Sequence, residues 1–345
     1  MRLNKIVFFF LTISLLSGCG QEKPFAAVAN GPCTSYQAQN VSDHITSQIG
    51  YLAQKDFEQA YSYAAISFQE NISLKAFNTF GLDATAQYFT EVKTVEAVVE
   101  VLSLETFKNT PKLFLGGGSN ILLTKDFEGL VIKIDIQGIA KVDENENHVY
   151  LKAGAGVVWH EFVLHCIAHD WAGVENLSLI PGTVGAAPMQ NIGAYGIEIK
   201  DVFEKLEALN LKTLEIETFT LEQCHFGYRE SIFKNSHKDQ YVILNVTFKL
   251  SKTPNFHVEY GAIKDTLKEM GIEQLSIKAI SDAVIHIRQS KLPNPAEIGN
   301  SGSFFKNPEI PKAQFDTLKE KFPHIVSFPS VNPELIKVPA GWLIE

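Results

Sequence analysis

Two glycine-rich stretches of this chain could hold a ligand through backbone groups rather than charged side chains. The longer one, Glu175–Gly196, contains two prolines and four glycines but no lysine or arginine. Glycine lets a ligand approach the main chain, proline stiffens turns, and N–H groups presented in this way can bind phosphate. The residues that we single out are Pro181, Gly182, Gly185, Gly193 and Gly196. Taken alone, the stretch would more simply be a tight loop between two strands.

A second glycine-rich stretch favours the ligand interpretation. Leu115–Asn120, L-G-G-G-S-N, lies between the apolar runs Lys112–Leu115 and Ile121–Thr124, which predict a strand, a loop and a strand. A Rossmann fingerprint needs spaced glycines that open a helix, whereas these glycines are contiguous and an apolar run follows them. The pattern therefore argues against a nicotinamide-binding Rossmann site and favours a pyrophosphate ligand such as a flavin dinucleotide. Its candidate residues are Gly116, Gly117, Gly118, Ser119 and Asn120.

With these loops in place, the chain from Ile72 onward resembles the UDP-N-acetylenolpyruvoylglucosamine reductase family of peptidoglycan synthesis. The resemblance covers roughly four fifths of the 345 residues, in the order of the family and without large gaps. Each matching motif is a weak to moderate signal, but the set is specific. The motifs are Asn78–Gly81, Gly116–Asn120, Ile180–Gly196, Gly227–Lys234, Lys291–Pro293 and Gly302–Pro308.

The resemblance implies a reaction and two catalytic residues. Family members reduce the enolpyruvyl group of a UDP-sugar with NADPH through FAD, so the site needs a proton donor and a cation that stabilises an enolate. Ser303 matches the proton donor, a role that a serine hydroxyl can fill only in a dry, preorganised site. Arg229 matches the catalytic arginine, whose planar fork suits a carboxylate. Without the resemblance, Ser303 would be a turn serine and Arg229 a strand arginine paired with Glu230 or Asp239.

Three further residues match family positions that hold the UDP part of the substrate. Lys291 can pair with a phosphate, Tyr260 can hydrogen-bond or stack, and Asn307 offers an amide. Each of them, taken alone, would more often be a surface or turn residue.

Composition limits the partners of the chain. The 345 residues, 45% of them hydrophobic, are enough for two or three domains. A net charge of −9 gives no general attraction to nucleic acid, and no Lys/Arg cluster overrides it. The cysteines are far apart and form no C-x-x-C motif, so we expect neither a metal site nor a redox pair, and we expect the last two to be buried thiols. They are Cys19, Cys33, Cys166 and Cys224.

Hydrophobic periodicity predicts an α+β fold, because helices and strands do not repeat as regular βαβ units. We expect helices over 94–102, 158–169, 277–288 and 311–322, and strands over 131–135, 148–153, 204–211, 215–220 and 241–250. The resemblance implies the vanillyl-alcohol-oxidase (PCMH) type of FAD-binding fold. It divides the chain into FAD-binding subdomains at 72–132 and 133–253 and a substrate-binding domain at 254–345.

The first 71 residues lie outside the resemblance. Arg2 and Lys5 precede a short apolar run that ends in L-S-G-C at Cys19, a pattern typical of a bacterial lipoprotein signal, so 1–20 is signal-like. Residues 21–71 read as a linker and a short helical segment, with helical spacing over 41–69. The family reaction is cytoplasmic, so we expect a cytoplasmic monomer that meets a membrane only where this signal is used.

The C-terminal end raises an alternative. Residues 340–345 begin a helix. The third catalytic residue of the family is a glutamate near the C-terminus, and nothing in this sequence up to Glu345 matches the segment that carries it. We therefore expect impaired turnover. The alternative is an envelope lipoprotein or non-catalytic flavin-binding module. A different flavin oxidoreductase on the same scaffold is disfavoured because Lys291, Ser303 and Asn307 occur together.

Overall fold

The computed structural model describes residues 66–259, 262–302, 305–330 and 332–344. These residues form two compact units. The first comprises 66–72, 85–115 and 126–137, and the second comprises 73–84, 116–125 and the rest of the described chain from 138 onward. None of the helices in the described part is both long and apolar enough to cross a membrane.

The first unit is a four-stranded sheet with one helix. Its strand order is β1-β2-β4-β3, and β2, β4 and β3 run parallel. The elements are β1 (Phe68–Ser73), β2 (Thr85–Val92), α4 (Val95–Ser103), β3 (Lys112–Leu115) and β4 (Phe127–Ile134). The predicted helix over 94–102 is confirmed as α4, where the Thr94 side chain accepts a hydrogen bond from the Ala97 N–H at 3.1 Å.

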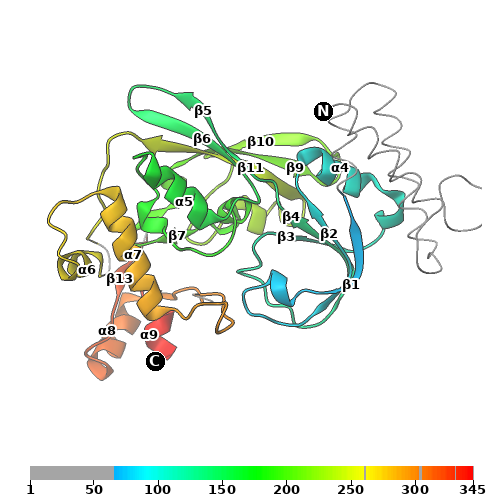
Figure 1. Cartoon of the computed structure of the whole chain (residues 1–345). Coiled ribbons are helices and arrows are strands. Elements are labelled where there is room, and N and C mark those ends of the chain that lie inside the picture. Colours follow the sequence, from blue (N-terminus) through cyan, green and yellow to red (C-terminus); the bar gives the residue numbers. More distant parts are fainter. Residues whose placement is uncertain (1–65, 260–261, 303–304, 331, 345) are drawn as a thin grey trace, which may run out of the picture. The chain divides into compact units, whose positions relative to one another are not determined.

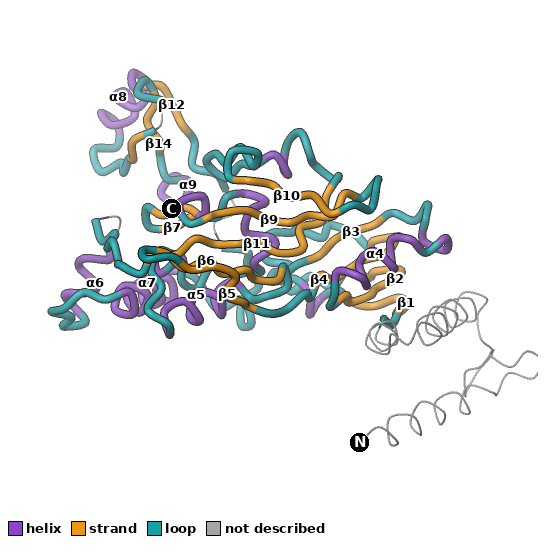
Figure 2. Tube along the Cα trace, turned by 90° about the horizontal axis from the view of Figure 1, so that it is seen from above, coloured by secondary structure: helices purple, strands orange, loops and turns teal. Residues whose placement is uncertain are grey.

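The second unit is built on a five-stranded antiparallel sheet in the order β10-β9-β11-β6-β5 (Figure 2). Its strands are β5 (Ile139–Glu144), β6 (His148–Gly154), β9 (Phe203–Asn210), β10 (Ile216–Thr220) and β11 (Tyr241–Ser251). The four predicted strands of this region are confirmed as β6, β9, β10 and β11. Only β5, with five of its six residues exposed, carries no clear hydrophobic signal.

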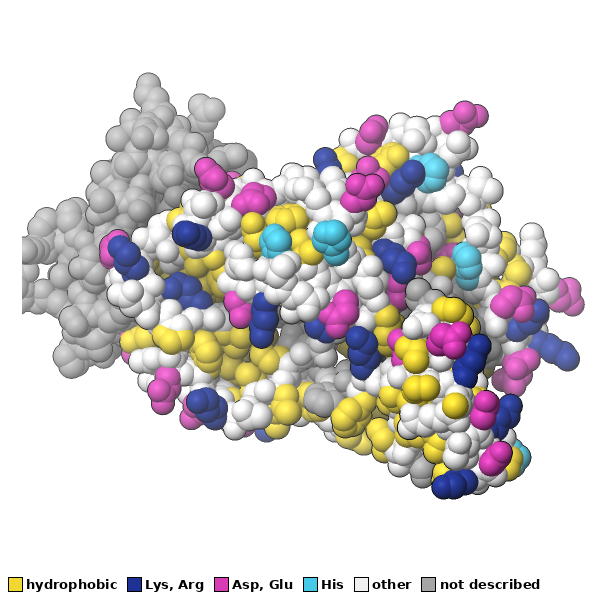
Figure 3. Space-filling model, turned by 180° about the vertical axis from the view of Figure 1, so that it is seen from behind, with side chains coloured by type: hydrophobic (Ala, Val, Ile, Leu, Met, Phe, Trp, Pro, Cys, Tyr) yellow, Lys and Arg dark blue, Asp and Glu magenta, His cyan; other side chains and the backbone are white. Residues whose placement is uncertain are grey.

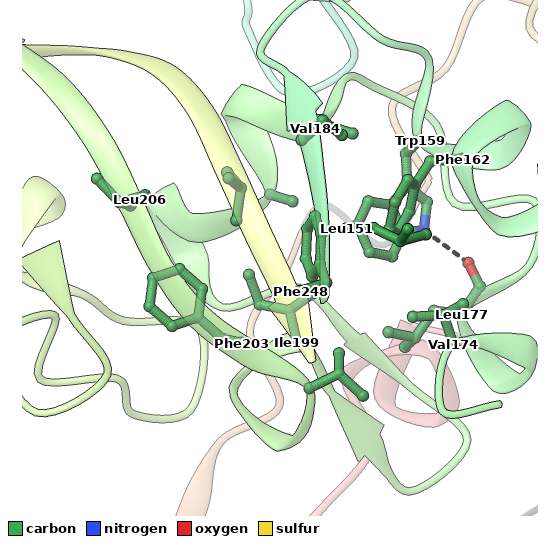
Figure 4. Close-up of a cluster of buried hydrophobic side chains, with 14 of the residues drawn as sticks. Leu151, Trp159, Phe162, Val174, Leu177, Val184, Ile199, Phe203, Leu206 and Phe248 are labelled. Carbon is green, nitrogen blue, oxygen red and sulfur yellow. Dashed lines mark hydrogen bonds between the residues drawn. The ribbon is translucent and has the colours of Figure 1, made fainter. Parts of the chain in front are cut away.

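An aromatic core joins this sheet to helix α5 (Trp159–Ala168) (Figure 4). The ring centroids of Trp159, Phe162 and Phe248 lie 4.6 to 5.8 Å apart, and all three side chains are fully buried. The Trp159 indole N–H donates to the Leu177 carbonyl at 2.9 Å. The core therefore also fixes the chain just before residues 181–185, which we call the Pro181 loop. Cys166 lies in the same core, and both it and Cys224 are free and buried, as predicted.

The remainder of the second unit consists of two smaller groups of elements (Figure 1). Helices α6 (Ile263–Glu269) and α7 (Ile277–Lys291) pack together through apolar side chains. A three-stranded antiparallel sheet, in the order β12-β14-β13, packs with helices α8 and α9 around Phe315, Ile325 and Val338. These elements are β12 (Glu309–Pro311), α8 (Lys312–Lys321), β13 (Phe328–Pro329), β14 (Leu335–Lys337) and α9 (Ala340–Ile344).

Two sequence predictions are wrong. Residues 121–124 are not a strand: they form an irregular connection in which Leu122 is 50% exposed, because no neighbouring strand pairs with this apolar run. The helical spacing assigned to 41–69 also fails at its end, where Phe68 and Gln69 begin β1. Residues 1–65, which include Cys19 and Cys33, lie outside the described residues. On the face drawn in Figure 3, acidic and basic side chains are interspersed.

Candidate active site

The Pro181 loop is held by backbone pairing to the chain that enters α5. The Trp159 N–H donates to the Gly182 carbonyl at 3.0 Å, and the Val184 N–H donates to the Val157 carbonyl at 2.9 Å. The Gly185 N–H donates to the Ala155 carbonyl at 2.9 Å. Since Trp159 is fixed in the aromatic core, these three hydrogen bonds hold the Pro181 loop rigidly in place.

The second glycine loop lies directly on the first. A Cβ atom added at Gly117 would stand 3.0 Å from the Gly182 Cα, and one added at Gly116 would stand 2.8 Å from Thr183 Oγ1. Farther along, the Asn120 side-chain amide donates to Gln190 Oε1 at 3.3 Å. The structure thus brings together two loops that are more than 60 residues apart in the sequence.

Two further segments, 78–80 and 299–302, complete this arrangement. The Thr79 N–H donates to the Gly118 carbonyl at 3.1 Å, and the Asn300 N–H donates to the Thr79 carbonyl at 2.9 Å. Asn78 is buried and fixes the loop by donating to the carbonyls of Leu74 and Leu82 at 2.7 and 2.9 Å. We call the meeting point of 78–80, 116–120, 181–185 and 299–302 the backbone cradle.

The glycines of the cradle are needed for loop-to-loop contact. We expected Gly117 and Gly185 to leave space for a pyrophosphate, but a Cβ at Gly185 would stand 2.5 Å from the Ala155 Cβ, so protein atoms fill that space. The cradle as a whole still fits a dinucleotide. The side-chain hydroxyls of Thr79 and Ser301 are buried at the cradle without a hydrogen-bond partner in the described chain. A polar ligand seated there would satisfy them.

Gly193 and Gly196 have a different local role. They shape a short hairpin of β7 (Gly193–Ala194) and β8 (Ile197–Glu198), in which Gly196 and Tyr195 both have positive φ angles. The Asn176 amide donates to the Tyr195 carbonyl at 3.1 Å and fixes this hairpin to the segment before the Pro181 loop.

Two residues that the sequence analysis missed hold the turn that leads into the Pro181 loop. Leu179 has a left-handed backbone with φ of 57°. Its N–H donates to His160 Nδ1 at 3.0 Å, and its carbonyl accepts from Arg288 Nε at 3.2 Å. Burial, and then the Arg288 charge, lowers the pKa of His160, which keeps Nδ1 unprotonated as the acceptor. Burial also lowers the pKa of Arg288. For Arg288, the available signal was its position at the end of the predicted helix 277–288, three residues before Lys291.

Arg229 lies in a tight turn rather than a strand. Gly227 and Glu230 exchange backbone hydrogen bonds at 3.0 and 3.2 Å, and Arg229 has φ of 55°. The Arg229 Nη1 donates to the Phe305 carbonyl at 3.2 Å, two residues beyond Ser303 in the sequence. Ser303 and Tyr260 themselves lie outside the described residues.

The other two predicted substrate residues are described. Lys291 is the exposed last residue of α7, one helical turn beyond Arg288. Asn307 Oδ1 accepts from the Ala340 N–H at 2.9 Å and so caps α9. The amide group of Asn307 could still donate to a ligand through its Nδ2.

Comparison with known proteins identifies the family. Residues 86–217 match the model of an FAD binding domain. The chain is 55% identical over 280 residues to the UDP-N-acetylenolpyruvoylglucosamine reductase of Amoebophilus asiaticus, which is 81% of this chain and 82% of that protein. It is 50% identical over 281 residues to the Flavobacterium johnsoniae reductase, again 81% and 82% of the two chains.

A solved structure supports the same assignment at the level of the fold. The crystal structure of the reductase from Thermus caldophilus matches with a TM-score of 0.53 and 21% identity, over 79% of this chain and 88% of that one. Together with the domain match, it confirms the predicted α+β, FAD-binding fold of the vanillyl-alcohol-oxidase type. On the sequence identities to its curated relatives, the chain belongs to the UDP-N-acetylenolpyruvoylglucosamine reductase family.

Proposed function

We propose that this chain reduces UDP-N-acetylglucosamine enolpyruvate to UDP-N-acetylmuramate, using NADPH through FAD. The relatives that are 50% and 55% identical to it over 81% of its length carry the name of this reductase. The observation that carries the proposal is the Arg229 turn, whose guanidinium donates to the carbonyl of Phe305, two residues after Ser303 in the sequence. A fixed cation is what a developing enolate requires.

In this proposal the backbone cradle holds FAD. Loops 116–120 and 181–185 would face its pyrophosphate, the Thr79 and Ser301 hydroxyls would donate to its polar atoms, and Gly193 and Gly196 would shape the adjoining hairpin. When bound, FAD supplies the hydride carrier between NADPH and the enolpyruvyl alkene. The cradle's own contribution is a pre-built surface, which binds without the entropic cost of ordering loops.

The remaining residues act on the sugar nucleotide. Arg229 binds the substrate carboxylate and stabilises the charge that develops on it, while Ser303 donates a proton to the alkene carbon that does not receive the hydride. Lys291, Tyr260 and the Asn307 Nδ2 would bind the UDP part. Residues 72–132 and 133–253 then serve the flavin, and 254–345 the substrate. Both NADPH and this substrate class belong to the cytoplasm, so the proposed reaction takes place there.

The test separates the two half-reactions in the full chain. Arg229→Met should be reduced by NADPH at the wild-type rate, because that step needs no enolate stabilisation, but its flavin should be reoxidised by the UDP-sugar about 10²–10³-fold more slowly. The exposed Lys238→Met, nine residues along the chain, is the matched control and should behave as wild type. An Arg229→Met protein with normal reoxidation would contradict the assignment.

A further inference from the structure

The ring of Tyr228, the residue before Arg229, has two ammonium groups within 6 Å of its centroid. Lys337 Nζ stands 3.7 Å from the centroid of the Tyr228 ring, and Lys306 Nζ stands 5.6 Å from it. An ammonium over an aromatic face is attracted by the ring quadrupole within about 6 Å. The shorter distance makes Lys337 the main partner of the ring.

The position of Lys337 is set by the C-terminal sheet. It is the last residue of β14, its side chain is only 16% exposed, and it pairs across the sheet with Glu309 on β12. The Lys337 Nζ to Glu309 Oε1 distance is 3.5 Å. Lys306 is less constrained, since its side chain is 51% exposed and its 3.3 Å ion pair with Glu230 is solvent-screened. A largely buried and paired ammonium constrains the ring more strongly than an exposed one does.

The turn that carries Arg229 needs such an anchor. A positive φ at a residue with a side chain is a strained conformation that persists only when its surroundings impose it. Two hydrogen bonds hold its backbone: Lys234 Nζ donates to the Arg229 carbonyl at 2.9 Å, and the Asn191 amide donates to the Gly227 carbonyl at 3.0 Å. Lys337 holds the side chain of Tyr228 in the same turn. The turn is thus fixed through both its backbone and a side chain.

We propose that Tyr228 and Lys337 are positioning residues for Arg229, through which the β12–β14 sheet sets the orientation of the catalytic guanidinium. The inference rests on the proposed function. Without the ring–ammonium contact, the turn relaxes and the guanidinium spends less time on the substrate carboxylate. The cost then falls on the second half-reaction, while reduction of the flavin by NADPH is unaffected.

Four variants of the full chain separate this role from a general loss of packing. Tyr228→Leu removes the quadrupole and Lys337→Met removes the charge but keeps the stem, whereas Tyr228→Phe and Lys337→Arg keep the contact. A matched control is Lys319→Met on α8, whose ammonium stands 6.0 Å from the Phe315 ring in the same group of elements.

The measurement is flavin reoxidation by the UDP-sugar, with reduction by NADPH as the reference. We expect Tyr228→Leu and Lys337→Met each to slow reoxidation about 3- to 30-fold, the range that one cation–π contact can supply. The double variant should be no slower than either single one, because both lose the same contact. Tyr228→Phe, Lys337→Arg and Lys319→Met should stay within about twofold of wild type.

The outcomes distinguish this inference from the proposed function. A wild-type chain whose reduced flavin is not reoxidised by the UDP-sugar would overturn both. A wild type that turns over, with Tyr228→Leu unchanged or with fully multiplicative effects in the double variant, would overturn the positioning role alone. A Tyr228→Phe variant as slow as Tyr228→Leu would instead make the phenol a direct ligand of the substrate and contradict the inference.

Discussion

Gly118 and Phe77 approach so closely that a Cβ added at residue 118 would stand 2.0 Å from the Phe77 carbonyl oxygen. Gly118 also has φ of 62°, a left-handed conformation. This contact seats the 116–120 loop on the segment around Asn78, so it determines the geometry of the backbone cradle. Both requirements, the space and the dihedral angle, exclude every residue except glycine.

Gly118→Ala should therefore destabilise the fold and abolish flavin binding. We expect a loss of about 2–4 kcal/mol, the sum of a strained φ and a backbone overlap. Gly271→Ala is the matched control, because Gly271 has φ of 68° and nothing within 4 Å of an added Cβ. It should lose only about 1 kcal/mol and keep its flavin. Denaturant unfolding measures the stability of both variants, and flavin absorbance measures their bound cofactor. Equal losses of stability in the two variants would contradict the packing argument.

Thr79→Val tests the buried hydroxyl at the cradle. In the absence of ligand a buried unsatisfied hydroxyl costs about 1–3 kcal/mol, so its removal should leave the flavin-free protein equally or more stable. FAD affinity should fall about tenfold, because a hydrogen bond to the cofactor is lost. Titration of the flavin-free protein with FAD gives the affinity. An unchanged FAD affinity would mean that this hydroxyl does not face the cofactor.

Asn307 offers a way to separate a structural role from a binding role. Asn307→Ala removes the cap on the Ala340 N–H and should cost about 1 kcal/mol. Asn307→Asp keeps the accepting oxygen and should recover that stability, but it replaces the amide N–H₂ by a carboxylate and should raise the KM for the UDP-sugar. If Asn307→Asp is fully active, Asn307 acts as a helix cap alone.

The pH dependence of stability should report His160. Its folded pKa is lowered below the usual 6.5, so as the pH falls below 6.5 the unfolded chain binds a proton before the folded one does. The unfolding free energy is therefore complete above pH 6.5 and decreases as the pH drops toward the folded pKa. His160→Asn keeps an acceptor for the Leu179 N–H and should flatten this slope in urea unfolding between pH 5 and 7. The exposed His286→Asn control should retain it.

The sequence predicts the regular elements well because their signals are local. Ile277–Lys291 has apolar residues at helical spacing, and Ser276 caps it by accepting from the Ala279 N–H at 3.0 Å. Strands β6, β9, β10 and β11 alternate apolar residues or are largely apolar, whereas β5 shows no such pattern. The run at 121–124 misleads, since apolar residues alone do not provide a neighbouring strand.

The site is less predictable because its contacts join residues far apart in the chain. Both glycine loops are evident in the sequence, but nothing local shows that Gly117 rests on Gly182. The same holds for the left-handed turn at Arg229 and for the hydrogen bonds of His160 and Arg288 to Leu179, which depend on packing between distant segments. The resemblance to a family supplies candidate residues, and the structure supplies the reasons for their positions.

The most direct measurement of the central claim is a single stopped-flow experiment on the full chain loaded with FAD. The flavin is first reduced by NADPH without oxygen, and the reduced protein is then mixed with UDP-N-acetylglucosamine enolpyruvate. We predict that the flavin absorbance returns with one UDP-N-acetylmuramate formed per flavin, at a rate below the roughly 10 per second typical of enzymes, because no residue matches the catalytic glutamate of the family. Flavin that stays reduced in the presence of saturating substrate would contradict the reductase assignment.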